Sequence, residues 1–279
     1  MLTVALIVIN VAVFIWQWQF PLDRDLEQAG LTTGIDQSAV EYGAIPYRIT
    51  HPSESECSLG AVKQSNGNLA AEIVCEGMPE FEQAIRIGER AAAQGADAGP
   101  IPLDQAPWLV TVFASMFMHG GILHLAGNML FLWIFGNNIE DSMGRVRFVV
   151  FYLLGGVFAL LGQVAVDPDA AVPTVGASGA IAAVLGGYAL LYPRARVVTF
   201  IFIIIIFTVV ELPALLVLGL WFLLQLAYGA NDIAQPVDGG GGVAYFAHLG
   251  GFLFGLLAIK LFANNVHEDY ESESRMPVY

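Results

Sequence analysis

Six long apolar stretches constrain this chain more than any other feature. They cover residues 2–20, 116–135, 148–166, 178–192, 213–228 and 244–262. A helix needs about 20 apolar residues to cross the roughly 30 Å hydrocarbon core of a bilayer. Only 13% of the 279 residues are charged, against about 25% in soluble proteins, which leaves too little polar surface for a water-soluble body. The chain is therefore predicted to be an all-α polytopic membrane protein with six transmembrane helices.

The apolar stretches divide the chain into four parts. Residues 1–20 lack the basic start and the small-residue cleavage site of a secretion signal, so we expect a retained first transmembrane helix. Residues 21–107 form a long polar first loop or small subdomain, in which 80–94 has the pattern of an amphipathic helix. Residues 108–262 hold the other five helices, and 263–279 form an acidic tail.

Basic residues in the short loops predict the orientation. Arg145 and Arg147 separate the second and third helices, Arg194 and Arg196 separate the fourth and fifth, and Lys260 lies near the end of the sixth. Short loops rich in Lys and Arg stay in the cytoplasm. Both termini are therefore expected there, with the long first loop outside and a bacterial inner membrane as the location.

One apolar stretch is too long for this scheme. Residues 197–228 exceed a single crossing, and two crossings would break the alternation of charged loops. We expect 197–209 to form an interfacial or re-entrant approach, with Pro213 in the first turn of the fifth helix.

The polar first loop holds both cysteines, Cys57 and Cys75. Outside the cell they would form a disulfide, and in the cytosol they would be two free thiols. The predicted orientation favours the disulfide. The formal net charge of -14 comes with no basic patch, so nucleic acid is not an expected partner.

Three polar side chains fall at one depth in the predicted bundle. About 24 Å of helix separates Ser178 from the cytoplasmic Arg194, and about 18 Å separates His248 from Lys260. His124 also lies about 24 Å from the cytoplasmic end of its helix. All three would lie several Å below the outer surface, where they could meet in one cavity. The alternative is that each forms its own hydrogen bond between helices.

Ser178 lies at the junction of a loop and the fourth helix. Gly176 and Gly179 flank it and permit close backbone approach. The free N–H groups of a helix N-terminus inside the membrane suit a developing oxyanion. The competing interpretation is that Ser178 is simply the N-cap residue.

His248 supplies the base that a serine nucleophile needs. Small residues such as Ala247, Gly251 and Gly255 line its helix, and the fourth helix has a similar face. Two such faces pack closely in membranes, which would bring His248 to Ser178. A packing interface without catalysis would show the same pattern.

His124 and Asn128 are four residues apart and share one helix face, from which both can donate to an oxyanion. For His119, a role in a buried hydrogen-bond network that fixes helix packing explains the residue as well as a role in the catalytic site does. No intramembrane carboxylate is present to complete a triad, so a Ser–His dyad remains. Without an HExxH pattern or a carboxylate at this depth, we expect neither a metal nor another cofactor.

These motifs resemble those of rhomboid proteases. His124 and Asn128 match the HxxxN motif, residues 176–179 match GxSG, and residues 247–251 match AHxxG. The motifs come in the family's order, on the second, fourth and sixth helices, and the resemblance covers about 108–262 together with the first helix.

The resemblance implies an intramembrane serine endopeptidase that cleaves transmembrane segments of membrane proteins. It implies that Ser178 is the nucleophile, that His248 is its base, and that His124, Asn128 and the Ser178 N–H hold the oxyanion. Its partners would be such substrates and the lipid bilayer. Some relatives carry an aromatic residue beneath the histidine where this chain has Ala182, so His248 must be oriented in another way.

Two other functions compete with proteolysis. A rhomboid-like protein without activity could bind membrane proteins in quality control, but such relatives typically lack the serine or the histidine. A small transporter would show inverted repeats and a charged pathway, and the sequence shows neither.

Overall fold

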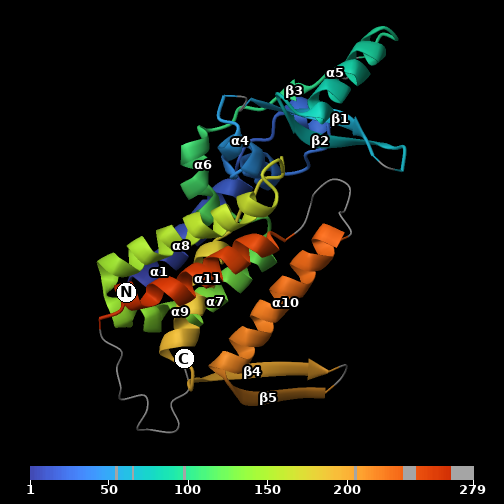
Figure 1. Ribbon diagram of the computed structural model, residues 1–279. Coiled ribbons are helices and arrows are strands. Elements are labelled where there is room, and N and C mark those ends of the chain that lie inside the picture. The colour runs from blue at the N-terminus through green and yellow to red at the C-terminus, as the bar shows by residue number, and fades with distance from the viewer. Residues whose placement is uncertain (54–55, 65, 97–98, 204–205, 235–242, 265–279) are drawn as a thin grey trace.

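A bundle of long helices carries a smaller N-terminal subdomain at one end (Figure 1). The computed structural model describes residues 1–53, 56–64, 66–96, 99–203, 206–234 and 243–264. The bundle consists of α1 (Leu2–Trp18), α7 (Ile122–Met143), α8 (Arg145–Val166), α9 (Ser178–Leu191), α10 (Ala214–Ala234) and α11 (Tyr245–Phe262). The predicted acidic tail lies almost entirely outside the described residues.

Four of these helices, α7, α8, α10 and α11, are long and apolar enough to span a membrane, while α1 and α9 are shorter apolar helices. The chain is therefore a mostly helical, multi-pass membrane protein. The second helix begins at Ile122 rather than at 116, because Gly120 and Gly121 interrupt it. Before the break, the chain forms α6 (Trp108–Ala114) and a 3-10 turn (Ser115–Phe117).

The N-terminal subdomain corrects the all-α prediction. It contains α2 (Arg24–Gln28), α3 (Gly34–Tyr42), α4 (Pro46–Thr50), β1 (Cys57–Lys63), β2 (Leu69–Cys75), α5 (Pro79–Ala92) and β3 (Ile101–Pro102). The strands form an antiparallel sheet in the order β2-β1-β3. Helix α5 is the predicted amphipathic helix, and Ala84 on it packs against Val62 and Val74 of the sheet.

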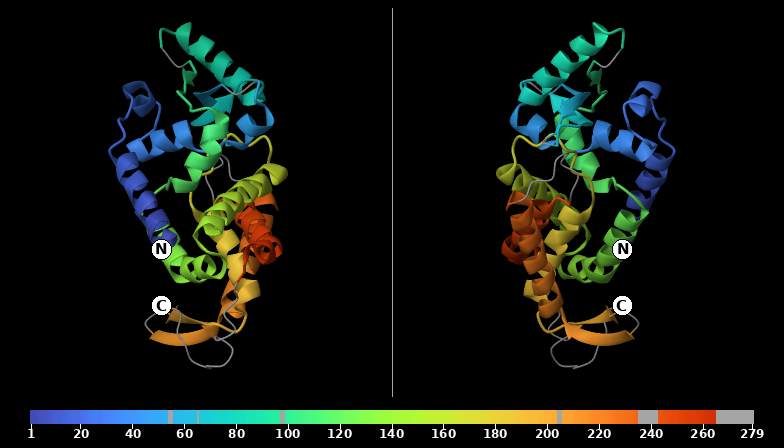
Figure 2. Two further views of the ribbon diagram at one scale, coloured as in Figure 1. Left: turned by 90° about the vertical axis from the view of Figure 1, so that its left-hand side faces the viewer. Right: turned by 90° about the vertical axis from the view of Figure 1, so that its right-hand side faces the viewer.

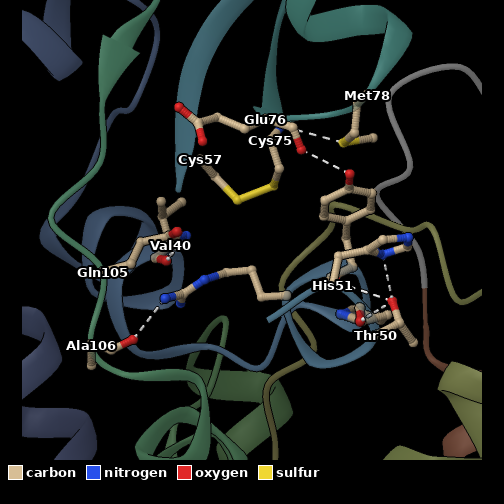
Figure 3. Close-up of a disulfide and its surroundings, with 12 residues drawn as sticks. Val40, Thr50, His51, Cys57, Cys75, Glu76, Met78, Gln105 and Ala106 are labelled. Atoms are coloured by element: carbon tan, nitrogen blue, oxygen red, sulfur yellow. Dashed lines mark hydrogen bonds between the residues drawn. A yellow bond between two sulfur atoms is a disulfide. The ribbon is translucent and has the colours of Figure 1, made fainter. Parts of the chain in front are cut away.

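A disulfide joins Cys57 to Cys75, as predicted. These residues face each other across β1 and β2, where the hairpin begins and ends (Figure 3). Beside the disulfide, the Tyr47 hydroxyl donates to the Glu76 carbonyl oxygen at 2.8 Å. Because Tyr47 belongs to α4, which packs against α8, this bond ties α4 to the residue that follows β2.

The apolar approach to the fifth helix is a β-hairpin. β4 (Arg196–Ile203) and β5 (Ile206–Pro213) pair antiparallel, at the opposite end of the molecule from the N-terminal subdomain (Figure 2). The segment is rich in β-branched residues, which favour strands. Pro213 ends β5 and directly precedes α10, instead of lying in its first turn.

Helix α9 forms the centre of the bundle, where every residue from Gly179 to Ala189 is buried. A side chain at Gly251 of α11 would collide with the Gly179 carbonyl, and one at Gly255 would collide with the Ala183 carbonyl. The predicted small-residue packing between the two helices is therefore present, with backbone against backbone.

Polar side chains hold both ends of α1. The Glu140 carboxylate of α7 accepts from Leu2 N, Thr3 N and Thr3 Oγ1 at 2.7–2.8 Å. At the other end, Gln17 accepts from His119 N at 2.9 Å and donates to Ser38 Oγ at 3.2 Å. The bonds to Glu140 satisfy two N–H groups that the start of α1 would otherwise leave free.

The N-terminal subdomain is bonded to the segment that leads into Ser178. Thr174 N donates to the Ala44 oxygen at 2.8 Å, and Ala44 N donates back at 3.2 Å. Tyr47 N also donates to the Ala170 oxygen at 3.0 Å. This pairing fixes the position of the segment just before α9.

Candidate active site

Ser178 and His248 meet between α9 and α11. Ser178 is the first residue of α9, and its Oγ lies 2.8 Å from His248 Nε2. The close packing of the two helices places the pair within hydrogen-bond distance. The Ser178 hydroxyl thus faces an imidazole, and Ala177 takes the N-cap position.

Gly176 shapes the approach to this pair. Its backbone φ of +131° is one that residues other than glycine rarely adopt. A Cβ atom at this position would also lie 2.9 Å from His124 Cε1. The Gly176 N–H donates to the Ser115 oxygen at 2.8 Å, which anchors the turn. Gly179 has a different role, since its missing side chain lets Ala159 of α8 approach α9.

His124 and Asn128 line the same cavity as Ser178 and His248. The Asn128 Nδ2 group is buried and has no hydrogen-bond partner among the described residues. A buried donor without a partner is costly, so this amide is available to an oxygen that enters the cavity. His119 does not line the cavity: it is fully buried, and its ring packs edge-on against His124 at 5.2 Å.

The cavity has a volume of about 1050 Å³, and its lining includes the Ser178–His248 pair together with Pro46 of the N-terminal subdomain. Gln163 of α8, Trp221 of α10 and Pro46 of α4 lie along its walls. A space of this size accepts an extended peptide segment of several residues. No group of three or more His, Cys, Asp or Glu side chains within the described parts of the chain could hold a metal ion.

Sequence reasoning missed two residues of α10 that contact His248. Gln225 Oε1 lies 2.8 Å from His248 Nδ1, and the Trp221 ring lies 5.8 Å from the imidazole at an angle of 36°. Both side chains lie beside the His248 ring, whereas Ala182 is fully buried in the core. The signal was present, because Gln225 is a single amide in a run of apolar residues, and polar groups at membrane depth are functional candidates.

Residues 107–265 match the family model described as "Rhomboid domain". The chain belongs to the rhomboid family. This rhomboid protein is 32% identical over 158 residues to "Rhomboid protein 1, mitochondrial" of Saccharomyces cerevisiae, an alignment that covers 53% of this chain and 40% of the yeast protein. It is 34% identical over 146 residues to the human "Presenilin-associated rhomboid-like protein, mitochondrial", covering 51% of this chain and 35% of that protein.

A bacterial relative is also found. The "Rhomboid protease GluP" of Bacillus subtilis is 33% identical over 124 residues, which cover 44% of this chain and 23% of that protein. The chain thus matches less than half the length of each of these relatives. The region that matches the family model, residues 107–265, includes α7 to α11 of the bundle but excludes α1 and most of the N-terminal subdomain.

Proposed function

We propose that this rhomboid protein is an intramembrane serine endopeptidase that cleaves transmembrane segments of other membrane proteins. The observation that carries the proposal is the 2.8 Å contact between Ser178 Oγ and His248 Nε2, in a cavity that is also lined by the Asn128 amide, which has no hydrogen-bond partner among the described residues. A serine becomes a nucleophile when an adjacent base takes its proton.

In the first step, Ser178 Oγ attacks the carbonyl carbon of the substrate while His248 Nε2 accepts the hydroxyl proton. The Asn128 amide, the His124 ring and the Ser178 N–H at the start of α9 would then donate to the oxyanion. His248 next gives its proton to the leaving amine, and water releases the acyl group by the reverse sequence. Gly176 and Gly179 support this site by letting the nucleophile's backbone approach its neighbours, and His119 supports it by packing against His124.

The proposal includes a topology of six crossings. Residues 1–20 form the first helix, 21–107 an external subdomain, 108–262 the catalytic core and 263–279 a cytoplasmic tail. The disulfide in the subdomain supports an external position, because disulfides persist in oxidising compartments. Both termini would then be cytoplasmic, and we propose a bacterial inner membrane. The yeast and human relatives are named as mitochondrial, so the family relationship alone fits more than one membrane.

The test compares wild type with Ser178→Ala and His248→Ala, using a transmembrane test substrate and a fluorophosphonate probe. Both variants should lose cleavage by a factor on the order of 10⁴–10⁶, and Ser178→Ala should lose labelling. Ser142→Ala is the matched control, because Ser142 is a buried serine of α7 that donates to the Ile139 oxygen.

Cleavage by Ser178→Ala at the wild-type rate would refute the dyad. A folded wild type that binds transmembrane segments without cleaving them or labelling would favour the binding function instead.

A further inference from the structure

Gln225 contacts the side of His248 that faces away from Ser178. The two ring nitrogens have different partners: Nε2 meets Ser178 Oγ, and Nδ1 meets Gln225 Oε1, each at 2.8 Å. Gln225 lies on α10, whereas the serine and histidine lie on α9 and α11. The imidazole is therefore held by side chains from two separate helices.

The chemistry of the amide oxygen fixes the hydrogen on the ring. An amide oxygen only accepts hydrogen bonds, so Nδ1 must carry the hydrogen that Gln225 receives. In a neutral imidazole, Nε2 then has none and accepts the hydroxyl hydrogen of Ser178. This is the tautomer that a general base for Ser178 requires.

Trp221 restrains the same ring. It lies one turn before Gln225, so both side chains leave α10 on one face. Its ring is 5.8 Å from that of His248 and 6.1 Å from that of Phe252, the residue one turn further along α11. The hydrogen bond thus sets the tautomer of His248, and the ring contact limits its tilt.

We propose that Gln225 is a positioning residue that completes a Ser178–His248–Gln225 arrangement, in which a neutral amide takes the place of the carboxylate of a catalytic triad. This inference rests on the proposed protease function. It assigns a role to α10 that the motifs on α7, α9 and α11 do not contain.

The test replaces Gln225 by Met, which keeps the length of the side chain and removes the acceptor. We expect kcat to fall by about 10–100-fold with KM within about twofold. His248 remains as the base, but no acceptor then keeps its hydrogen on Nδ1 or holds the ring in place. Fluorophosphonate labelling should slow by the same factor. Gln225→Glu, whose carboxylate accepts the same hydrogen bond, should recover most of the lost kcat.

Leu223→Met is the matched control, because Leu223 lies two residues away on α10 and is 60% exposed. Its kcat should equal that of wild type. Thermal unfolding of all variants in detergent separates a loss of orientation from a loss of fold.

Two results would overturn the inference while the protease function stands: wild-type kcat for Gln225→Met, or a kcat for Gln225→Glu as low as that of Gln225→Met together with a lower unfolding temperature in both. A wild type that neither cleaves nor labels would overturn both proposals together.

Discussion

The inner helices α9 and α11 and the outer helices α1 and α10 are held in place in different ways. The inner pair makes close backbone contacts at glycine, and α9 is buried from Gly179 to Ala189. Along α10, by contrast, only Ala214, Leu218 and Gly229 are buried. Lipid is as apolar as leucine, so packing and polar contacts rather than hydrophobic burial hold helices together in a membrane.

The outer helices rely on single polar side chains. Glu140 and Gln17 hold the two ends of α1, and Gln225 connects α10 to His248. The comparison indicates that close backbone packing of α9 and α11 sets the distance from Ser178 to His248. A few hydrogen bonds hold α1 and α10 in place beside that pair. Changes in the inner pair should therefore cost more than changes in the outer helices.

The largest effect is expected for Gly255→Ala. Its new methyl group would meet the Ala183 carbonyl, a backbone atom that cannot turn away, so we expect a loss of about 3 kcal/mol in the free energy of unfolding. Cleavage should fall with it, because α11 carries His248. The measurement is equilibrium unfolding in mixed detergent micelles together with a cleavage assay.

Gly219→Ala is the control on α10, where nothing lies within 4 Å of the added Cβ. It should keep wild-type stability or gain slightly, since alanine favours helix. Equal losses in the two variants would remove the distinction between inner and outer helices.

A smaller effect is expected for Glu140→Gln. The amide keeps the size of the side chain but loses the charge, which weakens the bonds from Leu2 N and Thr3 N. We expect a loss of about 1.5 kcal/mol in the free energy of unfolding. Asp141→Asn is the control, because the neighbouring Asp141 is exposed and should tolerate the change. An unchanged Glu140→Gln protein would show that α1 is held by its apolar contacts alone.

The smallest effect is expected for Gln17→Leu, which removes the acceptor for His119 N and the donor to Ser38. Single polar contacts of this kind contribute about 0.6–1 kcal/mol in membrane proteins. Unfolding of the purified protein measures the loss, and Gln19→Leu at an exposed position is the comparison. A loss as large as that of Gly255→Ala would contradict the proposed order.

The sequence predicted those features that repeat along the chain or follow from local chemistry. Apolar runs located the bundle helices, and the glycines on both sides predicted how α9 and α11 pack. The disulfide between Cys57 and Cys75 was also predicted correctly. The β1–β2 hairpin was missed, although Asn66 and Gly67 at its turn are a strong hairpin signal, and Gly67 has a φ of +86°.

Other features depend on contacts that no local pattern contains. Gln225 was not predicted, because the third member of a catalytic triad is usually a carboxylate and Gln225 is a neutral amide. The pairing of Ala44 with Thr174 joins main-chain atoms of residues far apart in the sequence, and such pairing leaves no trace in side-chain identity. The roles of Ser178, His248, His124 and Asn128 in a reaction remain predictions for the experiments above.

The pairing of Ala44 with Thr174 also bears on where this protein can be divided. The matched family region begins at residue 107, yet Thr174 within it shares two hydrogen bonds with a residue well before that boundary. In a chain trimmed to the family boundary, or in a chimera that joins this bundle to a foreign N-terminal segment, Thr174 would lose both main-chain hydrogen bonds to Ala44, four residues before Ser178. The N-terminal subdomain and the bundle are therefore best treated as one unit in protein engineering and in comparisons between species.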